Sequence, residues 1–428
     1  MGWRACITTS ATKRALSTAR LLTNVSLTGR ADHTSVFTVH EHKMSRPTRR
    51  QFLKSTATIA AGTALAMPHV RKAAAATLEL RWLGWEHYNV AKIVREFEKA
   101  YKVRISSSYI DANSEAYNTL RAGGTADFDL VMGDGFWPRL YAKQGLTQPV
   151  DYRKIANIDK VFPHFRPPGS TILQEEGGKA MIAAPNCWGG YGLTVNLNKI
   201  DKADAHSLSL LFNDKYGRRL STSARLEENI ALAGILAAHK MGTKTAARPD
   251  GKPFNPYVLT DAELEEAKAL LIKQKRLLVT RWNDENTLER LLRAEAVWAS
   301  PEWSGIYRRI HFDKLDGKTR LNMTHALRPT EGGLGWVDSW AISAGVTSSE
   351  KLELCHKWID WRLKPENMAI VATDLGWSPT VDVRRLIPRR YVETLFLNQT
   401  QVIQDLYQYD APSSPEKWER VWSEVQAA

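Results

Sequence analysis

Cysteine is scarce in this chain, with three in 428 residues. Cys6 lies near the N-terminus, and Cys187 and Cys355 are far apart, with neither a CxxC spacing nor a nearby pair of histidines. This pattern excludes a disulfide framework and a zinc site of the usual spacing. It leaves one bridge between Cys187 and Cys355, or two buried thiols. No cysteine directly follows Ala73–Ala76, so a lipid-anchored protein is not expected.

The short motifs of common enzyme classes are also missing. The sequence has no GxSxG, HExxH or GxGxxG motif, no Walker-type loop and no histidine cluster at ligand spacing. Gly123-Gly124-Thr125 follows a predicted helix instead of opening one, so it does not indicate a phosphate site. The sequence therefore predicts no catalytic residue, no cofactor and no metal.

Long apolar runs and excess charge are absent after residue 76. No stretch there approaches the roughly 18 consecutive apolar residues of a transmembrane helix. The whole chain has a formal charge of +13, but residues 1–76 hold 12 Lys and Arg against 2 Asp and Glu. The remainder holds 47 against 44, without a basic stripe, so nucleic acid is not an expected partner.

What is present near the N-terminus is a basic, apolar and small-residue series. Arg49-Arg50 precede Phe52-Leu53, an Ala-rich run follows from Ser55 to Met67, and Ala73–Ala76 come after a second basic pair. This order predicts a twin-arginine export signal over residues 44–76. The apolar run is too short and too rich in hydroxyl residues to span a bilayer stably.

We expect the twin-arginine translocon as the export partner, cleavage near Ala76 and a periplasmic location. Residues 1–43, which lack a sustained apolar period, are interpreted as a non-native or disordered leader.

The next hundred residues alternate between strand and helix patterns. Strands are predicted from Leu78, from Val103 and from Phe128, each followed by apolar residues at helical spacing. Such alternation favours a parallel sheet covered by helices, with a ligand crevice at the carboxyl ends of the strands. The α/β pattern therefore places residues 84–88, 109–111 and 133–135 together.

Further along, helices are predicted over residues 224–240, 261–275, 287–293, 349–363 and 365–375. A strand is predicted at 296–299, and two glycine-flanked strands at 191–196 and 335–342. The glycine-flanked strands are interpreted as two strands that cross between lobes and form a hinge.

Tryptophan is abundant, with 15 in the chain. Several lie at predicted strand ends or lobe junctions: Trp85, Trp137, Trp188, Trp298 and Trp336. Aromatic faces beside a carboxylate suit an organic cation.

Short motifs in a fixed order connect the chain with a known family. It resembles the periplasmic solute-binding proteins of ATP-driven importers, and within them the spermidine/putrescine-binding branch. The motifs that carry the resemblance are Gly84-Trp85-Glu86-His87-Tyr88, Phe128-Asp129-Leu130-Val131, Cys187-Trp188-Gly189, Gly335-Trp336-Val337-Asp338-Ser339 and Gly376-Trp377-Ser378-Pro379-Thr380.

The resemblance implies a two-lobed α/β periplasmic binding protein fold of type II. The first lobe is expected to comprise residues 77–187 with 337–378, and the second 188–336 with 379–428.

The resemblance also implies a ligand site. Trp336 and Asp338 would grip the chain and an amine of the ligand, Trp298 would supply a further ring, and Trp85 and Tyr88 would be the aromatic residues after the first strand.

Two positions depart from the family pattern, because His87 and Ser223 stand where acidic residues are expected. Glu227, Asp111 or Asp134 are the candidates to replace the missing carboxylates. These departures put binding of a full-length triamine in doubt more than the transport role.

The expected function is capture of a polyamine or another small organic cation by a monomer, which delivers it to an ABC permease in the inner membrane. An amino-acid-like or aminophosphonate solute is the alternative ligand. A Tat-exported periplasmic enzyme and a chemosensory binding protein are the rival classes.

Overall fold

The computed structural model describes residues 77–428 except 171, 176–179 and 249–250. The predicted leader and export signal lie outside these residues. All described residues belong to one compact unit. Within the described part of the chain, no helix is both long and apolar enough to cross a membrane.

The strands of the described residues join into one 12-stranded sheet, whose main path runs β2-β1-β3-β10-β5-β8-β6-β7. Strands β4 and β12 pair with β10, and β9 and β11 pair with β5. The strands are β1 (Glu79–Gly84), β2 (Arg104–Tyr109), β3 (Leu130–Gly133), β4 (Thr147–Gln148), β5 (Ala184–Asn196), β6 (Leu220–Ser223), β7 (Leu278–Trp282), β8 (Ala299–Glu302), β9 (Met323–Ala326), β10 (Leu334–Ser343), β11 (Ser378–Pro379) and β12 (Tyr407–Gln408).

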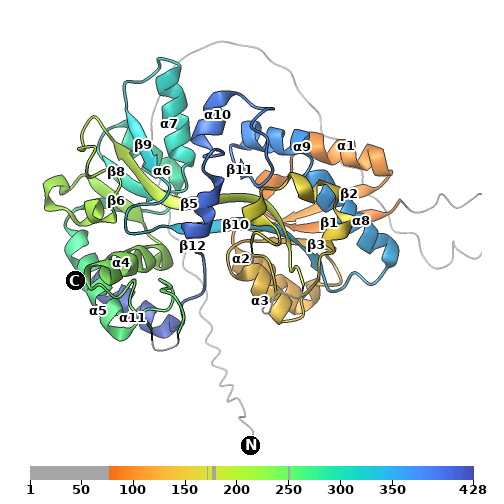
Figure 1. Cartoon of the computed structure of the whole chain (residues 1–428), viewed down its shortest axis with the longest axis horizontal. Helices are drawn as coiled ribbons and strands as arrows, with labels where there is room; N and C mark the ends of the chain where they lie inside the picture. Colours follow the sequence, from red (N-terminus) through yellow and green to blue (C-terminus); the bar gives the residue numbers. More distant parts are fainter. Residues whose placement is uncertain (1–76, 171, 176–179, 249–250) are drawn as a thin grey trace, which may run out of the picture. The chain divides into compact units, whose positions relative to one another are not determined.

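Helices cover this sheet (Figure 1). They are α1 (Ala91–Tyr101), α2 (Asn113–Thr119), α3 (Trp137–Lys143), α4 (Leu226–Lys240), α5 (Asp261–Lys275), α6 (Glu285–Arg293), α7 (Gly305–Leu315), α8 (Ser349–Arg362), α9 (Pro365–Ile370), α10 (Arg389–Thr394) and α11 (Pro415–Ala427). A short 3₁₀ helix, η1 (Glu86–Tyr88), follows β1.

The first lobe is built on β1, which pairs in parallel with both β2 and β3. This is the arrangement that the strand and helix alternation predicts. Helix α1 buries Ile93 and Phe97 on one side. The ring of Phe97 meets Trp358 of α8 edge-on, at 5.0 Å between centroids. Aromatic packing therefore fixes both helices on this sheet.

The second lobe has its own apolar core around β6, β7 and β8, which also pair in parallel. Helix α4 is buried on nearly every side. Helix α5 begins with a capping box, in which Thr260 and Glu263 each bond the backbone of the other. This reciprocal bonding satisfies two of the free N–H groups of the first turn.

Strands β5 and β10 belong to both lobes. They pair antiparallel with each other, and every residue of both strands is buried. The first half of β5 contacts β10 and β11, and its second half contacts β8 and β9. Figure 1 shows the two strands running side by side between the two groups of helices. The predicted pair of crossing strands is confirmed.

The last part of the chain is divided between the two apolar cores. Residues from Val381 to Leu406 pack into the core of the first lobe, and those from Trp418 onward into the second. The lobe boundaries given above stay a prediction. Cys187 and Cys355 are both buried and free, so the two-thiol alternative holds.

Candidate functional site

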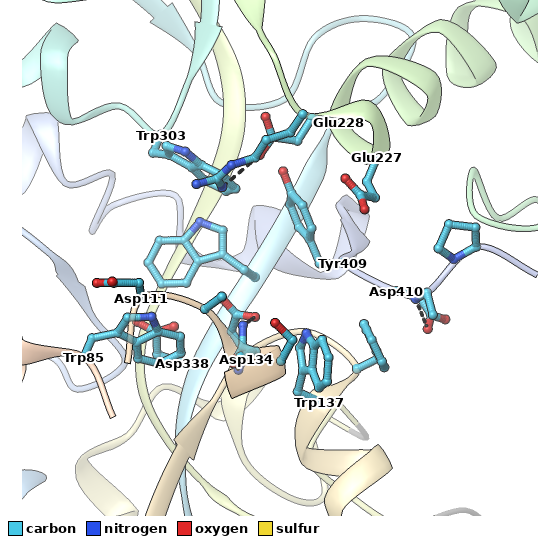
Figure 2. A pocket seen from close by; sticks show the side chains of 18 of the residues that line it. Trp85, Asp111, Asp134, Trp137, Glu227, Glu228, Trp303, Asp338, Tyr409 and Asp410 are labelled. Atoms are coloured by element: carbon cyan, nitrogen blue, oxygen red, sulfur yellow. Dashed lines mark hydrogen bonds and ion pairs between the residues drawn. The ribbon is translucent and has the colours of Figure 1, made fainter. Parts of the chain in front are cut away.

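A cavity of about 590 Å³ lies where residues of the two lobes meet at the crossing strands. Figure 2 shows Asp111, Asp134 and Asp338 on one side of it, with Glu227 and Glu228 facing them. Five tryptophans line the cavity: Trp85, Trp137, Trp303, Trp336 and Trp377.

Three carboxyl-terminal strand ends supply the first-lobe wall. Trp85 follows β1, Asp111 follows β2 by two residues, and Asp134 follows β3 directly. Parallel strands bring their carboxyl ends to one edge, so residues distant in sequence meet there. The three segments predicted to lie together do so.

Strand β10 supplies the floor of the cavity. Trp336 and Asp338 are two residues apart, and both line the cavity, as the period-two geometry of a strand requires. The register of β10 against β5 shifts between Asp338 and Ser339. Opposite Trp336 stands Gly189, where a Cβ atom would lie 2.6 Å from the indole Cζ2. The glycine therefore leaves room for the ring.

Asp134 and Asp338 are the two carboxyl groups at the edge between β3 and β10, of which Asp338 is buried and Asp134 half-buried. Asn113 Nδ2 donates to Asp134 Oδ1 at 2.8 Å, and the Tyr88 hydroxyl donates to Asp338 Oδ2. Burial raises the pKa of Asp134 to about 6. Burial, and next the charge of Asp134, raise the pKa of Asp338 well above its ordinary value.

The second-lobe wall comes from the start of α4. Glu227 and Arg225 are exposed, whereas Glu228 is buried. Glu228 accepts hydrogen bonds from the Ser223 hydroxyl and, at 3.4 Å, from Arg225 Nη1. Burial raises the pKa of Glu228, and the bond from Ser223 opposes this shift. Glu227, in contrast to Glu228, accepts no hydrogen bond from Ser223 or Arg225.

A series of aromatic rings extends around the cavity. His87 lies 5.1 Å from Trp377, and Trp377 lies 5.9 Å from Trp336, between ring centroids. Trp303 continues the series at 6.4 Å from Trp336 and 5.4 Å from Tyr409. Burial, and next the charge of Arg362, lower the pKa of His87 to about 4, so this ring is neutral at pH 7.

Seven of the ten residues predicted for the site line this cavity: Trp85, His87, Asp111, Asp134, Glu227, Trp336 and Asp338. Tyr88 and Ser223 do not line it but are buried directly behind Asp338 and Glu228. Trp298 lies elsewhere, with its indole Nε1 donating to the Glu295 carbonyl at 2.9 Å and Arg219 over its ring. The ligand contacts themselves stay a prediction.

The aromatic residue that lines the cavity from β8 is Trp303. The sequence places a strand at 296–299, but β8 spans Ala299–Glu302, so its end lies three residues later. Trp303 is the first residue after that end. The sequence would indicate Trp303 as a site residue only if the end of β8 were placed at Glu302.

The sequence does not predict three other lining residues, Trp377, Tyr409 and Asp410. Trp377 belongs to a motif that carries the resemblance, but it was not assigned to the site. Tyr409 and Asp410 follow β12, a two-residue strand with no sequence pattern of its own. Their approach depends on Gly135, whose φ of +54° and missing Cβ let its backbone pass the Tyr409 carbonyl.

The cavity is strongly acidic. Of the part of the chain that the structure describes, seven carboxyl groups line it, from Asp111, Asp134, Glu227, Glu228, Glu285, Asp338 and Asp410, and one guanidinium, that of Arg225. Carboxylates among aromatic faces favour a small organic cation over an anion. Among the described residues, no cluster of three or more His, Cys, Asp or Glu side chains is arranged to hold a metal ion.

Comparison with known proteins gives consistent results. A family model described as "Bacterial extracellular solute-binding protein" matches residues 92–388. The spermidine/putrescine-binding periplasmic protein of Salmonella typhimurium is 23% identical over 309 residues, covering 72% of this chain and 79% of that protein. Its namesake from Escherichia coli is 22% identical over 351 residues, covering 81% and 91%.

A solved structure is similar over the same region. It is the spermidine/putrescine ABC transporter substrate-binding protein PotD from Streptococcus pneumoniae, with a TM-score of 0.65 and 18% identity. The match covers 82% of this chain and 99% of that one. At this identity the likeness establishes a shared fold.

Proposed function

The chain belongs to the bacterial extracellular solute-binding proteins, and from this premise we propose that it captures a polyamine of the spermidine/putrescine type. It would deliver this solute to the permease of an ATP-driven importer. The names of the relatives from Salmonella typhimurium and Escherichia coli support this choice of ligand. Its task is then transport and not catalysis.

The observation that carries the proposal is the combination of charge and aromatic surface in one cavity. Seven carboxyl groups and five tryptophans line a volume of about 590 Å³. An alkylammonium ion gains from both, because rings cover its apolar stem and its charge while carboxylates accept its N–H bonds. In this proposal Asp338 accepts from one ammonium end and Trp336 covers the adjacent methylene groups.

Calorimetric titration with putrescine and spermidine tests this function. A hydrogen bond to a charged group contributes about 1.5–3 kcal/mol. Asp338→Asn should therefore weaken binding by about 10- to 150-fold. Asp316→Asn, the same chemical change at the exposed end of α7, is the control and should keep the parent affinity. An anionic solute that binds Asp338→Asn more tightly than the parent would contradict the cation assignment.

We also propose that the protein reaches the periplasm through the twin-arginine pathway and acts there as a monomer. The arginine pair and the Ala-rich run after it support this location. Changing Arg49 and Arg50 to Lys keeps the charge but removes the guanidinium groups. The precursor should then accumulate in the cytoplasm, as measured by fractionation and immunoblotting. An unchanged periplasmic yield would overturn this export route.

A further inference from the structure

Two carboxyl groups of the cavity, the buried Asp338 and the half-buried Asp134, lie opposite each other. Strands β3 and β10 are antiparallel, with Gly133 paired to Ser339. Extending this register by one residue places Asp134 opposite Asp338. Both side chains line the cavity, and Figure 2 shows them side by side. Like charges directly opposite each other on neighbouring strands repel.

Among the described residues, none supplies a compensating positive charge to Asp338 by direct contact. Its hydrogen-bond donor is the neutral hydroxyl of Tyr88. Cys187 of β5 is its strand partner, and burial raises the pKa of that thiol, so the thiol stays neutral. Arg362 of α8 reaches only the Tyr88 backbone carbonyl, at 3.3 Å. Its guanidinium lies behind the tyrosine ring, 6.0 Å from the centroid.

The surroundings of Asp134 are similar. Its hydrogen-bond donor is the neutral amide of Asn113 in α2. Tyr141 of α3 stays protonated because burial raises its pKa. The charge of Arg225, before α4, lowers the pKa of Asp134, but its guanidinium bonds Glu228 and is largely exposed. The other titratable residues around the pair are His87, Asp111, Glu227, Tyr257, Glu285, Tyr409 and Asp410.

Two adjacent carboxyl groups, one buried and one half-buried, do not both ionise readily when none of the described cations bonds them. The second ionisation would place two negative charges together where burial limits their screening by water. Such a pair titrates as a unit and keeps one proton to a higher pH than a single carboxyl group. The raised pKa values of Asp134 and Asp338 agree with this consequence of the geometry.

Building on the proposed function, we propose that the free site holds one proton between Asp134 and Asp338, and that the ammonium group of the ligand replaces it. On binding, the carboxyl O–H bond breaks and its proton passes to solvent. The ligand keeps its own protons, and its ammonium group donates hydrogen bonds to both carboxylates. The second negative charge on the pair is thus balanced by the positive charge of the ligand.

This exchange makes affinity depend on pH. A site that releases one proton binds about tenfold more weakly for each pH unit below the range in which the pair ionises. It also adds selectivity, because a neutral or anionic solute cannot compensate the charge that ionisation would create.

Two measurements on the purified protein test the proposal. Carbon-13 NMR of the aspartate carboxyl groups in the free protein should show one proton on the pair near neutral pH. Calorimetric titration with putrescine, in two buffers of different ionisation enthalpy at one pH, should show up to one proton released per ligand. Asp338→Asn should abolish this release, because one carboxyl group alone is ionised at neutral pH.

Asp111→Asn is the matched control. It removes an exposed carboxylate from the same cavity, so affinity should fall while the number of released protons stays the same. Putrescine binding with heats that are identical in both buffers, and a fully ionised pair in the free protein, would overturn the proton exchange and leave the proposed function standing. Absence of binding by putrescine and spermidine would overturn the proposed function and the exchange with it.

Discussion

At the scale of single residues, the position of the Trp336 ring depends on a residue with no side chain. Gly189 faces Trp336 across the two crossing strands, and an added Cβ would lie within 3.0 Å of three indole atoms. Both strands are buried along their whole length, so the backbone has little room to yield. The ring would have to rotate or shift.

Gly189→Ala should therefore lower both stability and affinity. Overpacking a buried position costs about 1–3 kcal/mol of unfolding free energy. Loss of the ring from a bound ammonium costs about 0.5–2 kcal/mol, or roughly 2- to 30-fold in affinity. Thermal unfolding and putrescine calorimetry measure the two effects.

Gly305→Ala is the control for this substitution. Gly305 begins α7, and its added Cβ would have no neighbour closer than 3.5 Å. A helical alanine there should stabilise by about 0.4–1 kcal/mol and leave affinity unchanged. Equal losses in both variants would show that the Trp336 contact is not responsible.

How far single site residues could be predicted depended on strand geometry. Trp336 and Asp338 were predictable, because a two-residue spacing on a strand places both side chains on one face. Tyr88 was predicted as a ligand contact, but its hydroxyl bonds Asp338 from behind. Nothing local separates these two roles, since both require a ring next to a strand end. The bond joins residues that are 250 positions apart, so the sequence around Tyr88 does not indicate it.

At the scale of elements, the start of α7 is held by a buried polar cluster of three residues. Glu302 accepts hydrogen bonds from the backbone N–H groups of Ile306 and Tyr307. The Thr194 hydroxyl donates to Glu302 and accepts from His325 Nδ1, each at 2.7 Å. This cluster satisfies the first turn of a helix that begins two residues after Trp303, which lines the cavity.

The cluster predicts a specific dependence of stability on pH. Burial lowers the pKa of His325 from 6.5 to about 3. Below pH 6.5 the unfolded chain binds a proton that the folded chain excludes, so stability is lost as pH falls from 6.5 towards 3. His325→Phe removes this loss while keeping a ring against Tyr307. Its melting temperature should fall less steeply between pH 6.5 and 4 than that of the parent.

Glu302→Gln should act in the opposite direction. Burial raises the pKa of Glu302 from 4.5 to about 7, so between these values the folded chain binds more protons than the unfolded chain. Stability from this group therefore decreases as pH rises through that range. Glu302→Gln removes this contribution, so the melting temperature should fall more steeply as the pH decreases from 7 to 4.5. Parallel melting profiles for both variants and the parent would contradict these titrations.

Elements with strong periodicity were predictable, and short polar ones were not. Helix α5 spans the predicted residues 261–275, because charged and apolar residues alternate at helical spacing there. Strand β6 was missed, since its sequence Leu-Ser-Thr-Ser is buried without being apolar. Helix α7 was missed because its N-cap, Ser304, has a left-handed backbone (φ +68°) and bonds no backbone N–H. Tertiary contacts determine the secondary structure of such segments, and the local sequence pattern does not.

At the scale of the whole molecule, the cavity between the lobes implies movement on binding. Its walls come from separate apolar cores joined by β5 and β10. A ligand that contacts both walls favours the state in which they are close. Small-angle scattering should show a smaller radius of gyration with saturating putrescine.

The same titration with Asp338→Asn separates closure from general compaction. At a putrescine concentration that saturates only the parent, this variant should keep the radius of the free protein. Identical scattering of the parent with and without putrescine, after calorimetry has shown that it binds, would contradict closure.

The shared strands also determine when this chain can fold during synthesis. The Ser339 hydroxyl bonds the Gly133 carbonyl across 206 residues, so the first sheet lacks a central neighbour until β10 has left the ribosome. Contacts of such long sequence separation form slowly. A chain exported while still unfolded would have to assemble both lobes at once outside the cell membrane. Export after folding, as the twin-arginine route would provide, would allow cytoplasmic chaperones to act while β10 pairs with β3.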